Sequence, residues 1–351
     1  MFGGDNAEFM YCFFNQGIGI CIEREGHNEK FLDMKSKVNG KNIFFIDNKS
    51  IVSTYSSRTI RRQESYLYNA KNYKKDDGTY VIRDEGKIPL VRYLEYVDEE
   101  VLEDSREKFL AELISLISSL FDFKLDVNTI NMAKQLEVAQ KNLLDKNTIS
   151  LDTYYKGTYN IETSRLFDIS DVQKKYIKLI GRIGYKDIKE QITEIKDGNY
   201  ILVDDDSATG KTIREILSLL PQRISIEQIY LLASIIKDKI FDIVDLRDFI
   251  IGALNGGLIV RLPNGEVARA PYMLPYVSLK SRATVSASKE MEVSLDLWEM
   301  NKEFYKNIGG NITLKDTDYG FKKLMKYIGF SEDTLLIDIC DWHLEKLTKE
   351  I

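Results

Sequence analysis

Residues 200–216 read YILVDDDSATGKTIREI, and this stretch decides the fold that we expect. Its first four residues form an apolar run that is typical of a buried central strand. The segment IREILSLL (213–220) repeats apolar residues at helical spacing, which predicts a helix packed on the sheet. Ligands of open α/β sheets bind beyond the carboxyl ends of the strands. We therefore expect Asp204 and Asp205 to lie at the mouth of a cleft.

The loop that joins this strand to the helix has the features of an anion-binding turn. Thr209-Gly210-Lys211-Thr212 would present backbone N–H groups at a helix N-terminus, and Gly210 would let the backbone approach a phosphate closely. A Walker A loop would need Gly where Asp205 stands. A ligand with a phosphate at one end and a diol at the other fits better. Adjacent carboxylates can accept hydrogen bonds from ribose hydroxyls or hold them through Mg²⁺.

The stretch resembles the motif by which type I phosphoribosyltransferases bind 5-phosphoribosyl-1-pyrophosphate (PRPP). That motif is an apolar run, two acidic residues, three variable residues and Thr-Gly-x-Thr. The matching residues here are Asp204, Asp205, Asp206, Ser207, Ala208, Thr209, Gly210, Lys211 and Thr212. Lys156-Gly157 resembles the family's short pyrophosphate-binding loop, because a basic residue and a glycine stand there ahead of the acidic pair.

The resemblance implies an α/β fold, a type I phosphoribosyltransferase-like parallel sheet flanked by helices. The division that we expect is a β-rich module over 1–97, a helical connector over 98–149, the phosphoribosyltransferase-like core over 150–287 and a helical region over 288–351.

It also implies a pentosyltransferase that moves a phosphoribosyl group to a nitrogen acceptor and releases pyrophosphate. In the implied roles, Asp204 and Asp205 hold the ribose diol and Mg²⁺, and Lys156 with Gly157 receives the pyrophosphate. Residues 206–212 bind the 5′-phosphate of PRPP or of a nucleoside monophosphate.

One position departs from part of the family. The 6-oxopurine members carry an Asp before Thr-Gly-Lys-Thr that handles a proton on the base, and this sequence has Ala208. Because alanine neither donates nor accepts a proton, a second hypothesis stays open: a catalytically altered sensor of PRPP or nucleotides, with appended modules that bind a partner. A third hypothesis, an effector that acts on a macromolecule or a nucleotide pool, has no residue that tests it.

Composition narrows the class of protein further. The net charge of −6 gives no overall positive field that would favour nucleic acid or an anionic membrane. Three cysteines and two histidines lack the spacing of a structural zinc site. No run of 18 apolar residues occurs. We expect a cytoplasmic protein without a membrane span.

The remaining patterns concern the additions and their partners. Apolar periodicity predicts helices over 98–120, 129–145, 288–307, 318–328 and 332–348, and Asn264-Gly265 predicts a turn between two strands. Residues 56–80 interleave tyrosines with lysines and arginines, a composition that suits single-stranded nucleic acid and also an exposed hairpin. A homodimer, a nucleic-acid partner and a protein partner therefore stay open, and the acceptor is unidentified.

Overall fold

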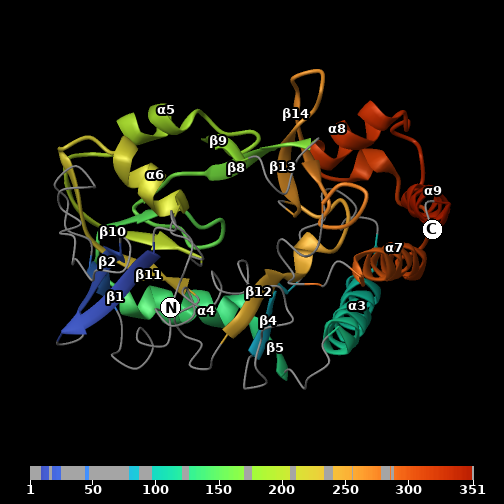
Figure 1. The fold of residues 1–351 in the computed structure, drawn as a ribbon, viewed down its shortest axis with the longest axis horizontal. Helices are drawn as coiled ribbons and strands as arrows, with labels where there is room; N and C mark the ends of the chain where they lie inside the picture. Colours follow the sequence, from blue (N-terminus) through green and yellow to red (C-terminus); the bar gives the residue numbers. More distant parts are fainter. Residues whose placement is uncertain are drawn as a thin grey trace. The chain divides into compact units, whose positions relative to one another are not determined.

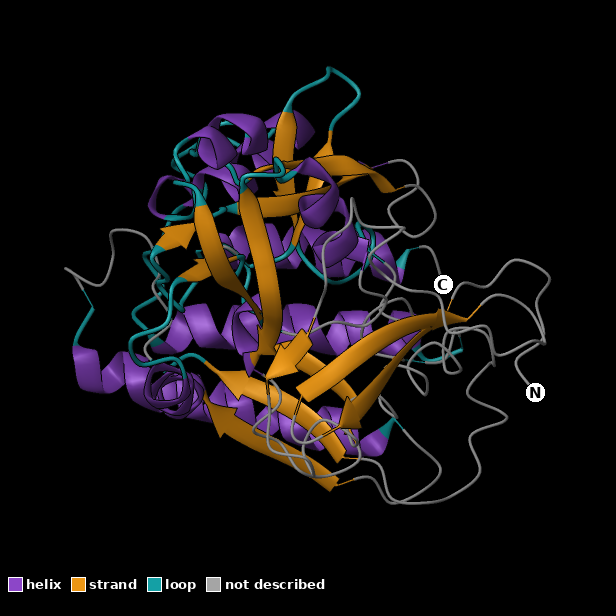
Figure 2. Ribbon diagram, turned by 90° about the vertical axis from the view of Figure 1, so that its left-hand side faces the viewer, coloured by secondary structure: helices purple, strands orange, loops and turns teal. Residues whose placement is uncertain are grey.

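The computed structural model describes residues 9–15, 18–24, 44–46, 79–86, 97–120, 126–169, 176–205, 211–232, 240–254, 256–277, 285 and 288–349. The tyrosine-rich basic stretch falls largely outside these residues, and so do residues 206–210 of the phosphate loop. Helices and strands alternate along the chain (Figure 1; Figure 2), so the protein has an α/β fold. No helix among the described residues combines the length and the apolar character needed to cross a membrane.

The chain forms two compact units. Unit 1 comprises residues 1–74, 133–164 and 179–241, and unit 2 comprises residues 75–132, 165–178 and 242–351. The chain passes from one unit to the other after residues 74, 132, 164, 178 and 241. The division expected from the sequence, into modules over 1–97, 98–149, 150–287 and 288–351, stays a prediction.

Unit 1 is built on a sheet with the order β1-β2-β3-β11-β10-β6-β7. Neighbours from β3 to β7 pair in parallel, whereas β1, β2 and β3 pair as antiparallel neighbours. Its strands are β1 (Phe9–Asn15), β2 (Ile18–Arg24), β3 (Phe44–Ile46), β6 (Thr148–Ser150), β7 (Tyr159–Asn160), β10 (Gly198–Asp204) and β11 (Ile224–Leu231). Its helices are α4 (Met132–Asn142), α5 (Ile188–Thr193) and α6 (Lys211–Leu219).

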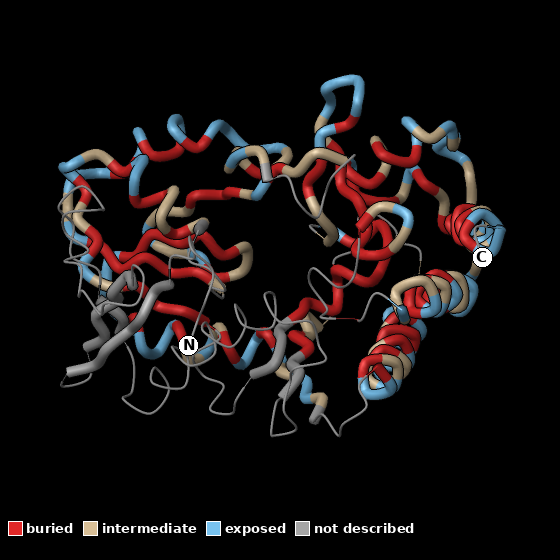
Figure 3. The backbone as a smooth tube through the Cα atoms, viewed as in Figure 1, coloured by how far each residue is buried: buried red, intermediate tan, exposed pale blue. Residues whose placement is uncertain are grey.

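Strand β10 lies at the centre of this unit and is buried from Tyr200 to Asp204 (Figure 3). Tyr200 and Leu202 join an apolar cluster with α5 and α6, while Ile201 and Val203 join a second cluster with α4. The alternation of side chains along a strand therefore covers both faces of the sheet with helices. The predicted strand and helix on either side of the acidic pair are confirmed.

A bulge keeps β11 in register with β10. The pairing shifts between Tyr200 and Ile201, and Glu227 is the residue that β10 skips. Ile226 before the bulge and Ile229 after it both reach the α5–α6 cluster. The extra residue shifts the alternation by one position. The apolar side chains after the bulge therefore point to the same face of the sheet as those before it.

Unit 2 contains two smaller sheets, with the orders β12-β4-β5 and β14-β13-β8-β9. Its strands are β4 (Thr79–Asp84), β5 (Asp126–Asn131), β8 (Thr163–Asp168), β9 (Tyr176–Gly181), β12 (Ile240–Asp245), β13 (Leu258–Arg261) and β14 (Val267–Ala270). Its helices are α3 (Glu99–Ser119), α7 (Glu290–Asn307), α8 (Tyr319–Ile328) and α9 (Leu336–Thr348), with the short 3-10 turns η5 (Leu246–Asp248) and η7 (Leu314–Asp316).

Most of the predicted elements of unit 2 are present. Helices α3, α7, α8 and α9 and the β13–β14 hairpin confirm the sequence prediction, and Gly265 takes a φ of 86° in the hairpin turn. The expected helix over 129–145 is shorter, because β5 occupies residues 126–131 and α4 begins only at Met132. Strand β5 pairs in parallel with β4, so a long-range ladder outweighs the local helical pattern there.

The core of unit 2 includes a histidine. The His343 ring stacks on Trp298 with the ring centroids 4.0 Å apart. Its Nε2 lies 2.6 Å from the Tyr276 hydroxyl, and its Nδ1 lies 2.6 Å from the Ile339 carbonyl oxygen. Burial lowers the pKa of His343 to about 4. Both ring nitrogens therefore have oxygen partners within the core of unit 2.

Charged side chains gather where β4 and β12 end. Arg83 Nε donates to Asp245 Oδ1 over 2.5 Å, and Arg247 Nη2 lies 2.9 Å from Asp245 Oδ2. The Glu85 side chain is fully buried, 3.5 Å from Arg247 Nε, and neither carboxyl oxygen has a hydrogen-bond partner among the described residues. Burial raises the pKa of Glu85 to about 8, helped by the charge of Asp245 and opposed by Arg247 and Arg83.

A stability test follows from Glu85. Because its pKa is raised from 4.5 to about 8 in the folded protein, its contribution to stability is present below pH 4.5 and is lost as the pH rises through 8. The free energy of unfolding should fall over this window by up to about 1.4 kcal/mol per pH unit. The variant Glu85→Gln should remove this part of the pH dependence in urea titrations at pH 5, 7 and 9.

The matched control is Glu107→Gln, on the exposed side of α3. It should follow the wild-type pH dependence. A Glu85→Gln variant that is less stable than the wild type at pH 9 would show that the Glu85 carboxylate is ionised and paired in the folded protein.

Candidate functional site

In unit 1 the chain turns in opposite directions after β6 and after β10. The two strands pair in parallel, so their carboxyl ends lie at the same edge of the sheet. The chain leaves β6 toward β7 on one side, and it leaves β10 through α6 toward β11 on the other. Such a point of divergence is where open α/β sheets bind ligands. The sequence predicts Asp204 and Asp205 at the mouth of a cleft. The structure places them at this edge with Asp204 buried and Asp205 half-buried, and the cleft itself stays a prediction.

Three acidic residues meet at this edge. Asp204 ends β10 and is buried, Asp205 follows it half-buried, and Asp152 lies buried two residues beyond β6. The Asp205 N–H donates to Asp204 Oδ1 over 3.0 Å. Burial raises the pKa of the Asp204 carboxyl well above its usual range, and the negative charges of Asp205 and Asp152 raise it further.

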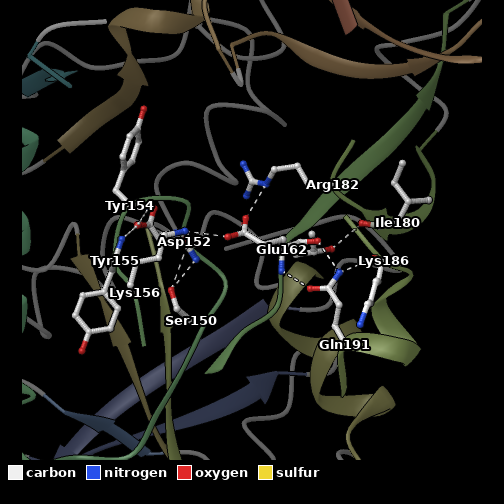
Figure 4. A network of polar contacts seen from close by, with 11 residues as sticks. Ser150, Asp152, Tyr154, Tyr155, Lys156, Glu162, Ile180, Arg182, Lys186 and Gln191 are labelled. Carbon is white, nitrogen blue, oxygen red and sulfur yellow. Dashed lines mark hydrogen bonds and ion pairs between the residues drawn. The ribbon is translucent and has the colours of Figure 1, made fainter. Parts of the chain in front are cut away.

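The loop after β6 is organised by Asp152 (Figure 4). Asp152 Oδ1 accepts hydrogen bonds from the backbone N–H groups of Tyr154 and Tyr155, at 2.8 and 2.6 Å. Ser150 Oγ accepts from the Asp152 N–H at 3.1 Å. These bonds fold residues 152–155 into a tight turn, which fixes the Asp152 carboxylate at the sheet edge.

Lys156 and Gly157, the predicted pyrophosphate loop, follow this turn. Lys156 Nζ lies 3.0 Å from Glu162 Oε1, with its side chain 59% exposed. The Gly157 N–H donates to Asn160 Oδ1 over 3.1 Å. A Cβ on Gly157 would lie 2.8 Å from Thr148 Oγ1, so the loop needs glycine in order to lie against β6.

Glu162 joins the loop to the segment before α5 (Figure 4). Its carboxylate is buried and forms a second ion pair with Arg182, with Nε 3.1 Å from Oε2. Gln191 of α5 accepts from the Glu162 N–H at 2.7 Å and donates to the Glu162 carbonyl oxygen at 3.1 Å. Two cations thus share one buried carboxylate beside the loop.

The phosphate-binding part of the prediction is described only at its two ends. Asp206, Ser207, Ala208, Thr209 and Gly210 lie outside the described residues, as does the side chain of Lys211. Helix α6 begins at Lys211, and Thr212 is half-buried in its first turn. The strand end and the helix start therefore flank the loop as the sequence predicted.

Sequence reasoning missed Asp152, Glu162 and Arg182. A signal for Asp152 was present, because TISLD (148–152) alternates polar and apolar residues as a short strand does and ends in an acid, as YILVD (200–204) also does. Glu162 and Arg182 lack such a signal, since their pairing joins residues twenty positions apart through the fold.

The donor set at the sheet edge fits a hard cation. Carboxylate oxygens are the ligands that Mg²⁺ prefers, and it is commonly held by one or two carboxylates together with substrate phosphates. Within the described part of the chain, no group of three or more His, Cys, Asp or Glu is close enough to hold a metal without such help. Asp204 and Asp205 would supply the protein's share.

Comparison of the chain with protein-family models, with curated proteins and with solved structures found no match in any of the three. The fold is α/β, with acidic residues at the carboxyl ends of two parallel strands. The chemistry of this candidate site rests on its own residues.

A charge-neutral variant tests the cost of burying Asp204. Because its pKa is raised in the folded protein, the charged form lowers stability as the pH rises above the usual range of an aspartate. Asp204→Asn keeps the acceptor for the Asp205 N–H and should raise the melting temperature at pH 8 but not at pH 4. Glu190→Gln on the exposed side of α5 is the control. A lower melting temperature for Asp204→Asn at both pH values would contradict the prediction.

Gly157 offers a test of the loop. A Gly157→Ala methyl would meet Thr148 Oγ1 at 2.8 Å and the Tyr159 carbonyl oxygen at 3.0 Å, so we expect a loss of about 1–3 kcal/mol in urea titrations. Adding Thr148→Ala should recover part of that loss, because it removes the nearer atom. Wild-type stability for Gly157→Ala would mean that the loop does not lie against β6.

Proposed function

We propose that the protein binds PRPP, or the ribose 5′-phosphate part of a nucleotide, at the carboxyl ends of β6 and β10. The observation that carries the proposal is the pair of buried Asp204 and half-buried Asp205 at the sheet edge, directly before a loop that enters α6. Without a ligand, burial and the neighbouring carboxylates destabilise the charged form of Asp204. Ribose hydroxyls would donate hydrogen bonds to this carboxylate, or Mg²⁺ bound with them would offset its charge.

The proposed reaction transfers the phosphoribosyl group to a nitrogen acceptor. The bond from C1 of the ribose to pyrophosphate breaks, a bond from C1 to nitrogen forms, and the proton of the acceptor passes to solvent. Asp204 and Asp205 would hold the diol and offset the positive charge that develops on the sugar ring. Residues 206–212, resembling the family's PRPP loop, would hold the 5′-phosphate at the start of α6.

Lys156 would meet the leaving pyrophosphate. Its side chain is 59% exposed and pairs with the buried carboxylate of Glu162. Because Glu162 also pairs with Arg182, it keeps a cation when a pyrophosphate draws Lys156 away. Mg²⁺, when bound to Asp204 and Asp205, would add charge neutralisation of the pyrophosphate.

Two observations support the alternative, a sensor that binds ligand without turnover. Ala208 cannot handle a proton on a base, and Lys156 and the Gly157 N–H are both engaged within the loop. A site of this kind would bind PRPP or a nucleotide without turnover and would report its presence to a partner.

The decisive measurement is pyrophosphate release from PRPP and Mg²⁺ across a panel of nucleobases, with a melting-temperature shift measured on the same samples. For the enzyme, we expect release with one base and a loss of about 100- to 1,000-fold in Asp204→Asn/Asp205→Asn. For the sensor, we expect stabilisation by PRPP, about 2.7 kcal/mol at a concentration of 100 times Kd, without release.

Glu190→Gln serves again as the control and should behave as the wild type in both assays. If PRPP and nucleoside monophosphates neither stabilise the wild type nor release pyrophosphate, both forms of the proposal are wrong.

A further inference from the structure

The outer face of α8 carries an unusual set of side chains. Phe321, Leu324 and Met325 face inward and are buried, as the helical repeat of an amphipathic helix requires. The outward stripe, at positions three, four, seven and eight after its first residue, consists of Tyr319, Lys322, Lys323, Lys326 and Tyr327. The two tyrosines are 61% and 47% exposed, so their rings are available to a ligand.

This stripe lines a groove on unit 2. The groove has a volume of about 440 Å³ and lies between α8 and the β13–β14 turn, whose exposed tip Figure 3 shows. We call it the tyrosine–lysine groove; its lining residues are Asn264, Glu266, Tyr319, Lys322, Lys323, Lys326, Tyr327 and Glu332. Its volume falls in the range of small-ligand sites.

A buried ion pair holds the two walls of the groove together. Asp318 caps α8 by accepting from the Gly320 and Phe321 N–H groups, and its Oδ1 lies 3.2 Å from Arg269 Nε of β14. The Arg269 side chain passes so close to Gly320 that a Cβ there would meet it at 2.5 Å. The start of α8 and the hairpin are therefore fixed relative to each other, and the groove is a preformed feature.

The lysines of the groove form only weak interactions with neighbouring residues. Lys323 Nζ lies 3.8 Å from Glu266, and Lys326 Nζ lies 3.0 Å from Glu332, with both partners of the second pair about half exposed. Lys322 Nζ donates to the Lys315 carbonyl oxygen at 2.7 Å. Exposed pairs of this kind contribute little. Three ammonium groups against two carboxylates leave a local positive charge on a protein whose net charge is −6.

We propose that the tyrosine–lysine groove binds single-stranded nucleic acid. The rings of Tyr319 and Tyr327 stand about two helical turns apart, about 12 Å along the axis. Lys323 Nζ lies over one face of the Tyr319 ring, 5.0 Å from its centroid, so a base would stack on the other face. Lys322, Lys323 and Lys326 lie between them and would neutralise the phosphates. Stacking faces interleaved with cations are the recurring chemistry of single-strand binding. Tyrosine rings also contribute to protein–protein interfaces, so an acidic protein is the alternative occupant that the experiment must distinguish.

The test is fluorescence anisotropy of the full chain with labelled twelve-residue oligo(dT) and oligo(U) between 50 and 200 mM salt. Three phosphate contacts predict a slope of about −2 for log affinity against log salt concentration. Tyr319→Ala and Tyr327→Ala should each weaken binding about 5- to 100-fold, and the corresponding Phe variants should retain it. Lys322→Gln should reduce the slope by about 0.7.

Matched controls separate this site from others. Tyr185→Ala removes a tyrosine of unit 1 that is 56% exposed and should leave binding unchanged. Asp204→Asn/Asp205→Asn should also leave it unchanged, so this proposal can fail or succeed independently of the PRPP site. Circular dichroism of each variant confirms that α8 is intact.

Three outcomes would overturn the proposal. The first is the absence of oligonucleotide binding at 50 mM salt. The second is equal binding of polyglutamate with the tyrosine variants unaffected, which would assign the groove to an acidic protein. The third is tighter binding of free uridine monophosphate than of oligo(U), which would assign it to a mononucleotide.

Discussion

The burial of a negative charge at the end of β10 is the constraint on which the site depends. Asp204 ends a central strand whose two faces are covered by apolar clusters, so its carboxyl group lies in a region of low dielectric constant. Asp205 and Asp152 add like charges and raise its pKa further. Sequences optimised for stability alone avoid such an arrangement. An acidic group buried at the edge of a parallel sheet is the physical basis on which we propose a ligand there.

The helices of unit 1 are arranged so that both faces of β10 are covered. Helices α5 and α6 on one side and α4 on the other satisfy its alternating side chains. The bulge at Glu227 allows the longer strand β11 to keep its apolar residues on the correct face. The chain then diverges after β6 and β10, and Asp204 stands at the carboxyl end of the strand that is covered on both faces.

The sequence predicted those parts of the structure that local patterns determine. The apolar run before Asp204, the amphipathic repeat of α3 and the Asn-Gly turn each depend on neighbouring residues, and each prediction is confirmed. The ladder between β4 and β5, the Glu162–Arg182 ion pair and the charged cluster around Glu85 depend on residues that are distant in sequence. Spacing along a single chain carries no information on such contacts, which is why Asp152 alone among the missed site residues left a pattern.

The Lys156–Glu162 ion pair accommodates both of the proposed functions, and Arg182 explains how. If a pyrophosphate draws Lys156 away, Glu162 remains paired with Arg182 inside the loop support, so no buried carboxylate is left without a cation. Removing one partner of a buried pair is otherwise costly. The second cation therefore makes the release of Lys156 energetically small, and the loop can exchange an internal carboxylate for an anionic ligand while Gln191 still holds the Glu162 backbone in place. Occupancy of the site thereby changes the loop by one exposed side chain, which suits an enzyme that must release its product and a sensor that must release its ligand.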